Sequence, residues 1–559
     1  MKGPRGTFLA LASLCMIHGV VAQVSGVHTE WPRWCGKVYE SKYPSFNPGG
    51  FLSAPTSSSS LMLYPQIEPL HSIYVSSEKI GSFIVHASLS YYRGSAYTEP
   101  KTLLPEILHV KVSIPESNHV LVSNFVTVNS TRNVFDFDLS PLVPQMEGYN
   151  VTLSLTSVEG NKEYTAMTQL FYLPDKTSGS VTKINNLYGG MLFKNAKTNN
   201  EFIPLLPFGF YADYSGWLNV STDNIQAYYD MGLNAIHPVA EYDGSASWDY
   251  MDEINLLWQY DMRYTFMNST SVVEQVTAVK DHPALFAWYT GDEPDGWEYA
   301  LNATQIAYDT IASIDKYHPV GLVLNCQNYY FEYYSNGADF LMEDAYPVGI
   351  NASYSKWGTP CNSTYGDCGC DNCQGSLRDI PDRLDDFTTY QEWLGQLPRP
   401  LWAVQQAFDG EGYWARDPTV KEVWVMNQLA FNHKAKAIMS WIYPTTAEIA
   451  AAYSAQAKVV TVKPVVDFML GAHLEAITVP GYESLDVASW TVQGQTMISI
   501  VSTSNININD TVKIPLAGFA LKIDSQPWGN LTLELNWSHQ ELEIKGLAAL
   551  TTSLVILEL

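Results

Sequence analysis

Basic residues are scarce in this 559-residue chain, in which 31 Lys and Arg face 57 Asp and Glu for a formal net charge of −26. A field of that sign repels phosphate backbones, so no nucleic-acid partner is expected. A polyanionic substrate is disfavoured for the same reason, unless a local basic pocket overrides the average. The acidity fits an extracellular protein.

Three catalytic signatures are also absent: His-Glu-x-x-His, Gly-x-Ser-x-Gly and the glycine-rich phosphate loop. Zinc proteases, α/β-hydrolases and P-loop enzymes use these motifs, so their chemistries are not expected. We expect neither a metal nor a cofactor.

Long apolar runs are missing after the first 22 residues, so no membrane span is expected in the mature chain. Residues 1–22 are typical of a secretory signal, with Lys2 and Arg5 before an apolar stretch and Ala22 at a small-residue cleavage site. We expect a secreted, extracellular protein.

Asn-X-Ser/Thr triplets support secretion independently and predict N-glycans. Ten begin at Asn129, Asn150, Asn219, Asn268, Asn302, Asn351, Asn362, Asn509, Asn530 and Asn536.

Cysteines are few, and Cys15 leaves with the signal. Six remain, an even number that predicts disulfides in a secreted chain. Four of them fall within residues 361–373. A four-thiolate zinc site is the alternative there, but an oxidising compartment favours disulfides that staple a long loop. Their connectivity stays open.

The chain is too long for one domain, and its pattern of predicted secondary structure changes twice. Residues 23–185 show short alternating strands typical of a β-sandwich, and residues 471–559 return to that pattern. Between them, residues 186–470 alternate strand and helix eight times, which predicts an α/β fold: a (β/α)₈ TIM barrel flanked by N-terminal and C-terminal β-sandwich domains. A doubly wound open sheet is the alternative, but its glycine-rich turn is absent.

The predicted barrel strands are 202–214, 233–239, 262–267, 285–290, 320–324, 338–342, 401–406 and 435–441. The predicted helices are 219–231, 248–260, 269–280, 301–316, 380–394, 419–433 and 446–470.

The most informative stretch is the apolar fourth strand, which ends abruptly in Asp292-Glu293-Pro294. Proline cannot continue the ladder, so the carboxylates stand at the strand's carboxyl end, where barrel active sites lie. A carboxyl beside aromatic walls such as Trp288 can have a raised pKa, which a general acid needs. A structural acid that caps the next helix is the alternative.

This pattern resembles the glycoside hydrolases of the large (β/α)₈ superfamily, whose retaining clan ends strand four in Asn-Glu-Pro. The order of sandwich and barrel, with Leu206-Pro-Phe-Gly-Phe-Tyr211 opening strand one, is similar to that of β-galactosidase-like and β-glucuronidase-like enzymes. The resemblance covers residues 200–470 well and the flanking domains in outline. It implies hydrolysis of O-glycosidic bonds in an oligo- or polysaccharide, with Glu293 as the acid.

The chain departs from that clan at strand seven, where the nucleophilic glutamate is replaced by Gln405-Gln406. Two other carboxylates could be the catalytic partner of Glu293. Asp344 follows strand six, and Glu411 lies beyond strand seven. Glu343 and Asp344 alternate, so only one of them is expected to face the pocket. Retention and inversion both stay open, because they depend on the distance between the two carboxyls.

Other polar and aromatic residues at strand ends are candidates for substrate binding, with core packing as the alternative for each ring. They are Tyr211, Asp213, Glu241, Trp288, Asp292, Asn325, Tyr346, Gln406 and Trp441.

Two other functions remain open: a transglycosylase of cell-wall glycans, and a non-catalytic barrel that binds carbohydrate, which the glutamines at strand seven favour. We also expect the cysteine-rich insertion after strand six to wall one end of the cleft, which would favour exo action.

Overall fold

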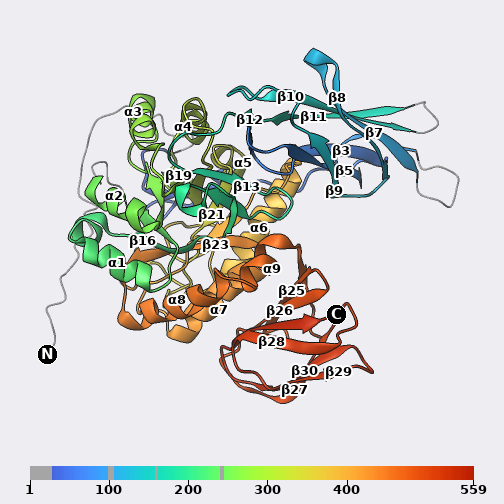
Figure 1. Ribbon diagram of the computed structural model, residues 1–559. Helices are drawn as coiled ribbons and strands as arrows, with labels where there is room; N and C mark the ends of the chain where they lie inside the picture. Colours follow the sequence, from blue (N-terminus) through green and yellow to red (C-terminus); the bar gives the residue numbers. More distant parts are fainter. Residues whose placement is uncertain (1–27, 99–105, 158–161, 240–244) are drawn as a thin grey trace.

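The computed structural model describes residues 28–98, 106–157, 162–239 and 245–559. The predicted signal and Glu241 lie outside these ranges. At its centre, eight parallel strands close into a barrel in sequential order, β16 to β23 (Figure 1), which confirms the predicted fold class. No helix among the described residues has the length and apolar character needed to cross a membrane.

The barrel strands are β16 (Phe208–Ala212), β17 (Ala235–Pro238), β18 (Leu257–Asp261), β19 (Leu285–Asp292), β20 (Val320–Leu324), β21 (Phe340–Glu343), β22 (Leu401–Ala403) and β23 (Ala435–Tyr443). The helices are α1 (Thr222–Asp230), α2 (Ser245–Ile254), α3 (Ser269–Val279), α4 (Ala303–Ala312), α5 (Phe331–Ser335), α6 (Asp379–Leu394), α7 (Val420–Asn432), α8 (Ala447–Val460) and α9 (Val465–Gly471). Helices cover the barrel strands, which is why these strands are apolar almost throughout.

The predicted third strand, 262–267, is wrong. The helix before it ends at Ile254, and the strand is β18, which starts at Leu257. The fully buried residues of β18 continue an apolar pattern that a helix would also show, so periodicity does not separate the two. Asn255, in a left-handed conformation with φ of 61°, marks the true helix end. The predicted last helix is two helices, α8 and α9, and the short α5 was not predicted.

The N-terminal sandwich packs two four-stranded sheets around its own core. Their strands are β3 (Met62–Pro69), β5 (Ile80–Ser90), β6 (Ser95–Ala96) and β9 (Asn133–Asp138) against β7 (Ile107–Ile114), β8 (His119–Thr127), β10 (Tyr149–Ser157) and β11 (Glu163–Leu170). A short parallel pair, β4 (Tyr74–Val75) and β12 (Tyr172–Leu173), lies beside them.

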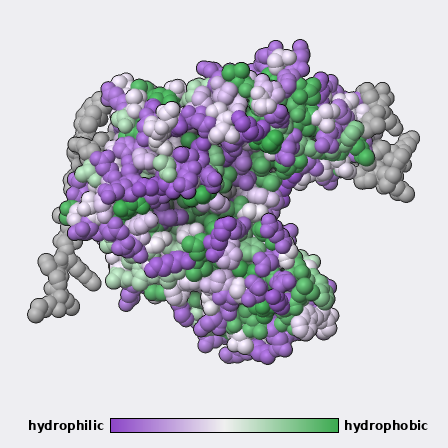
Figure 2. Space-filling view, viewed as in Figure 1, coloured by the Kyte–Doolittle hydropathy of each residue, from purple (hydrophilic) through white to green (hydrophobic). Residues whose placement is uncertain are grey.

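The C-terminal domain is a second two-sheet structure with a separate core. One sheet holds β24 (Leu474–Ala476), β25 (Leu485–Val492), β26 (Gln495–Ser502), β28 (Lys522–Trp528) and β31 (Thr552–Glu558). The other holds β27 (Ile508–Pro515), β29 (Leu533–Asn536) and β30 (Glu541–Leu547). Figure 2 shows a notch between this domain and the N-terminal sandwich, on the right of the view.

A small sheet covers the amino-terminal end of the barrel. It consists of β13 (Val181–Ile184), β14 (Met191–Lys194) and β15 (Ile203–Leu205). Ser180 Oγ, just before β13, donates to the carbonyl oxygens of His282 and Leu285 where β19 begins. The sheet therefore closes the face opposite the carboxyl ends of the strands.

Residues 28–52, named here the N-terminal segment, lie on the barrel and not in the sandwich. The segment holds the short pair β1 (Arg33–Trp34) and β2 (Lys37–Val38). Three ties fasten it: a disulfide between Cys35 and Cys326, and buried ion pairs Arg33–Glu298 and Lys37–Asp371. No sequence pattern indicated this placement.

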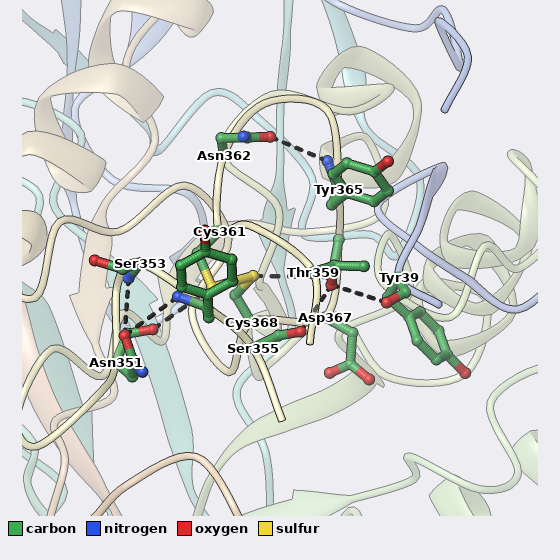
Figure 3. Close-up of a disulfide and its surroundings, with 12 residues drawn as sticks. Tyr39, Asn351, Ser353, Ser355, Thr359, Cys361, Asn362, Tyr365, Asp367 and Cys368 are labelled. Carbon is green, nitrogen blue, oxygen red and sulfur yellow. Dashed lines mark hydrogen bonds between the residues drawn. A yellow bond between two sulfur atoms is a disulfide. The ribbon is translucent and has the colours of Figure 1, made fainter. Parts of the chain in front are cut away.

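The four clustered cysteines pair within their loop, Cys361 with Cys368 and Cys370 with Cys373. Figure 3 shows the first of these disulfides beside Asp367. Thr359 of the same loop donates its hydroxyl to the backbone oxygen of Tyr39, at 2.9 Å. The insertion and the N-terminal segment therefore support each other over the barrel.

We predict that Gly209→Ala prevents folding. A Cβ at this position in β16 would lie 1.8 Å from the backbone oxygen of Ala235 and 2.6 Å from the Tyr228 hydroxyl. That hydroxyl already joins the two strands, since it accepts from Phe210 N and donates to Ala235 O, each at 2.8 Å. Soluble yield and thermal melting would measure the effect.

The control is Gly518→Ala, where the nearest atom would be 3.6 Å away. We expect it to melt like the wild type. A Gly209→Ala protein that melts within about 2 °C of the wild type would contradict the packing described.

Candidate active site

A cavity of about 220 Å³ opens at the carboxyl ends of the barrel strands. Loops after four strands, the cysteine-rich insertion and the N-terminal segment all contribute to it. It is lined by Trp34, Asp292, Glu293, Asn325, Asp344, Tyr346, Asp367, Cys368, Gly369, Cys370, Asp371, Phe408, Glu411, Tyr413, Trp414 and Trp441.

Two carboxyls meet in this cavity through one amide. Asn325, directly after β20, donates from Nδ2 to Glu293 Oε1 at 3.0 Å and to Asp344 Oδ1 at 3.2 Å. Asp344 faces the cavity, whereas Glu343 points away and binds the amide of Ala345, as the strand alternation requires. The pair predicted from the sequence is therefore brought together.

Burial and mutual repulsion raise the pKa of the carboxyl pair. Burial and the neighbouring Asp344 raise the pKa of Glu293 well above its ordinary value. Burial also raises the pKa of Asp344, against the hydrogen bonds that it accepts. Two like charges this close cannot both ionise easily, so the pair keeps one proton to higher pH than a free carboxyl would. That is the condition for a general acid near neutral pH.

Glu293 sits in a strained backbone conformation, with φ of 48° and a proline after it. Left-handed φ values are uncommon outside glycine and asparagine, and they concentrate at functional sites. The turn it forms aims the side chain across the barrel mouth at Asp344.

Asp292 is held by groups that the sequence did not single out. Arg263 donates to Asp292 at 2.8 Å and to Asp261 at 2.6 Å, and the Tyr289 hydroxyl donates to Asp292 at 2.6 Å. Arg263 lies 5.3 Å from the ring centre of Trp441. Burial opposes ionisation of Asp261, but Arg263 brings its pKa down to about 2. The misplaced third strand hid Asp261 and Arg263, because both stand at the true strand end.

Aromatic side chains wall the cavity, as a sugar-binding site requires. Predicted Tyr346 and Trp441 are among them, and Trp34 is an unpredicted member from the N-terminal segment. Phe408 and Trp414 pack edge to face at 4.8 Å between ring centres. No local pattern marks Trp34, since its approach to the barrel depends on a disulfide to a residue 291 positions away.

Several predicted residues do not reach the cavity. Trp288 is fully buried and points into the helix layer, where its indole donates to Asp315 at 2.9 Å. Gln406 is buried and bonds the backbone of Val348 in both directions, so it ties two loops together. Asp213 accepts from Gly216 N at 3.1 Å and begins the turn after β16.

Tyr211 lies beneath the cavity, and Glu411 lies at its rim. Tyr211 is buried below the cavity, stacked on His237 at 4.0 Å between ring centres. Glu411 lines the cavity from its exposed rim and is not enclosed as Glu293 is. Gln405, the other strand-seven glutamine, points to α7 and donates to Met426 O. No carboxylate of the described residues takes the clan's position at strand seven.

Among the described residues, two clusters have the composition of a metal site. One combines Asp371 with Cys35 and Cys326, whose sulfurs are already joined in a disulfide. The other is Asp249, Asp252 and His282, and none of these lines the cavity. Neither cluster includes Glu293 or Asp344.

A closed parallel barrel with paired acids at its carboxyl ends is the architecture of a (β/α)₈ enzyme. No model of a known protein family matches the sequence, and no curated protein matches it. Solved structures with a similar fold include glycoside hydrolases.

A GH2 β-galacturonidase from Eisenbergiella tayi, bound to galacturonate, is 14% identical with a TM-score of 0.32 over 69% of this chain and 66% of that one. A β-glucuronidase from Ruminococcus gnavus is 12% identical with a TM-score of 0.33 over 70% and 62%. The chain thus spans just under two thirds of the length of these two. A family 39 glycoside hydrolase from Bacteroides cellulosilyticus WH2 is 10% identical with a TM-score of 0.41 over 89% and 100%. Likenesses of this size leave function to be argued from the site itself.

We predict that Glu293→Gln becomes more stable than the wild type as the pH rises. The folded protein holds the Glu293 proton above pH 4.5, where the unfolded chain releases it, so stability is lost as the pH climbs towards the folded pKa. Glutamine removes that loss, worth about 1.4 kcal/mol for each unit by which the pKa is raised. Thermal melting from pH 4 to pH 8 would measure it.

Glu201→Gln, at an exposed position, is the control and should show no such trend. A pH-independent difference between Glu293→Gln and the wild type would show that Glu293 titrates normally.

Proposed function

We propose that the chain is a glycoside hydrolase that cleaves O-glycosidic bonds of an oligo- or polysaccharide. The observation that carries this proposal is the enclosed pair Glu293 and Asp344 in an aromatic-walled cavity. Glycoside hydrolysis needs one carboxyl that stays protonated and a second on the other side of the scissile bond. Glu293 would protonate the departing oxygen, and Asp344 would act on the anomeric carbon.

The spacing favours retention of configuration. One amide nitrogen contacts both carboxyls, at 3.0 and 3.2 Å, so the two groups are close neighbours, as a retaining site needs. Asp344 would form the covalent glycosyl intermediate as Glu293 gives up its proton. Glu293 would then take a proton from the water that releases the sugar.

The charge of the cavity favours a neutral sugar over a uronate. Six carboxyl side chains line it, and no lysine or arginine does. Two of the six are paired from behind, Asp371 with Lys37 and Asp292 with Arg263. The Glu293–Asp344 pair keeps one proton, and the lining as a whole stays acidic. A sugar carboxylate would be repelled in this enclosed space.

The cysteine-rich insertion supports exo action. Residues 367–371 of the insertion line the same cavity as Glu293, so they bound the cleft on that side. A wall there would stop a polysaccharide from running through the site. Export and N-glycosylation remain proposals from the sequence, and the three disulfides are consistent with an oxidising compartment.

The first test compares wild type, Glu293→Gln and Asp344→Asn on aryl glycosides of both anomers and on plant and fungal polysaccharides. We expect turnover by the wild type and a loss of about 10³-fold or more in each variant. NMR of the first-formed anomer would report retention or inversion. Sugar binding without turnover in the wild type would favour the non-catalytic barrel, and transfer to added acceptor sugars would favour the transglycosylase.

The second test pairs each neutral hexoside with its C6 uronate. We expect kcat/KM at neutral pH to favour the neutral sugar by about tenfold or more, which corresponds to about 1.4 kcal/mol. Equal or faster uronide hydrolysis would contradict the charge argument and leave the acid pair in place.

A further inference from the structure

The Cys35–Cys326 disulfide lies directly beside the acid pair. It joins the residues that directly follow Trp34 and Asn325. Trp34 Nε1 donates to Asn325 Oδ1 at 2.8 Å. The disulfide therefore clamps the two residues on either side of one hydrogen bond, at the edge of the acid pair.

That hydrogen bond determines which way the Asn325 amide faces. An amide presents a donor at one end and an acceptor at the other. With Oδ1 occupied by the Trp34 indole, Nδ2 points at Glu293 and Asp344. The reversed amide would set its oxygen against both carboxyls and its NH₂ against another N–H, so it is disfavoured while Trp34 is in place.

The rest of Asn325 is already fixed. Its backbone N–H donates to Asp295 at 3.2 Å, and its carbonyl oxygen accepts from Arg383. Rotation of the side-chain amide is the freedom that remains, and the indole removes it.

We propose that Trp34 is a positioning residue for the acid pair, acting through Asn325, and that the Cys35–Cys326 disulfide holds it there. The inference rests on the proposed glycosidase function, in which Glu293 and Asp344 carry the chemistry. A segment from outside the barrel thus completes the site.

Loss of the Trp34 indole is expected to raise the pKa of the acid pair. Glu293 faces the acids Asp344, Asp292 and Asp295, and the positive charge of Arg383 acts on Asp344 in the opposite direction. In this acidic setting the Asn325 donor favours the ionised form of Asp344. Without Trp34 the amide can turn its oxygen to the pair, which raises the pKa of both carboxyls.

The test is Trp34→Phe, which keeps an aromatic ring and removes the N–H. We expect kcat to fall about 10- to 100-fold with KM changed less than about threefold, and both limbs of the pH–rate profile to move to higher pH. The matched control is Trp297→Phe. Trp297 packs on Trp34 with ring centres 5.2 Å apart, is exposed, and does not line the cavity.

Equal effects of Trp34→Phe and Trp297→Phe, or a fall in kcat with an unmoved pH profile, would overturn the proposal. Gly296→Ala is an independent variant, since its Cβ would lie 2.3 Å from the Trp34 ring and displace it. We expect it to shift the pH profile in the same direction as Trp34→Phe.

The disulfide is tested by Cys35→Ser with Cys326→Ser. We expect folded protein with the same upward shift of the pH profile, smaller than in Trp34→Phe because the buried ion pairs of Arg33 and Lys37 remain. An unchanged profile would show that the disulfide does not hold Trp34.

A substrate-free measurement separates this inference from the proposed function. If the pKa of the pair rises in Trp34→Phe, the stability gap to the wild type widens as the pH rises from 5 to 8. In a Glu293→Gln, Asp344→Asn background the same gap should be independent of pH. A widening gap in a protein without hydrolytic activity would uphold the positioning and reject the glycosidase. A constant gap in both backgrounds would reject the positioning.

Discussion

The Asn325 amide, held between two enclosed carboxyls, is the interaction on which the candidate site depends. Two acids buried side by side repel each other and are poorly solvated, so they need donors and shared protons to stay together. The amide supplies the donor, and the barrel supplies the rigid strand ends from which all three side chains project. Both carboxyls and the amide line the same cavity.

Three cations of this acidic chain hold the buried groups around the candidate site. Arg263 lies between Asp261 and Asp292, and Lys37 pairs with Asp371. Arg383 bonds the carbonyl oxygens of Asn325 and Asp371. Buried pairs of this kind contribute little net stability, but the loss of one partner leaves an uncompensated charge. Their effect is to fix the loops while leaving the cavity surface itself anionic.

Most of the barrel could be predicted from the chain because its strands are short apolar runs between helices with clear caps. The third strand was misplaced because Leu257–Asp261 is buried throughout and follows a helix without a proline or glycine between them. Only the left-handed Asn255 marks the break. Because the strand was placed too late in the chain, Arg263 did not appear at a strand end and was not predicted as a site residue.

Part of the candidate site could be predicted from the sequence and part could not. Glu293, Asn325 and Asp344 follow their strands directly, and Trp441 lies near the end of β23, so the rule that barrel sites form at carboxyl ends was enough to predict them. Trp288 was predicted by the same rule but faces the helix layer, as alternate residues of a strand do. Gln406 lies beyond the end of its strand, and its side chain bonds the backbone of Val348. Trp34 belongs to no strand of the barrel and could not be selected.

The sequence by itself determined the barrel, its two flanking sandwiches and the acids at the end of strand four, because hydrophobic period and strand-terminating proline are local properties. Only the tertiary structure decided the partner of Glu293, the orientation of the Asn325 amide and the entry of Trp34. Those depend on side-chain direction, burial and one long-range disulfide, which bring together residues 34, 293, 325 and 344 from four separate segments.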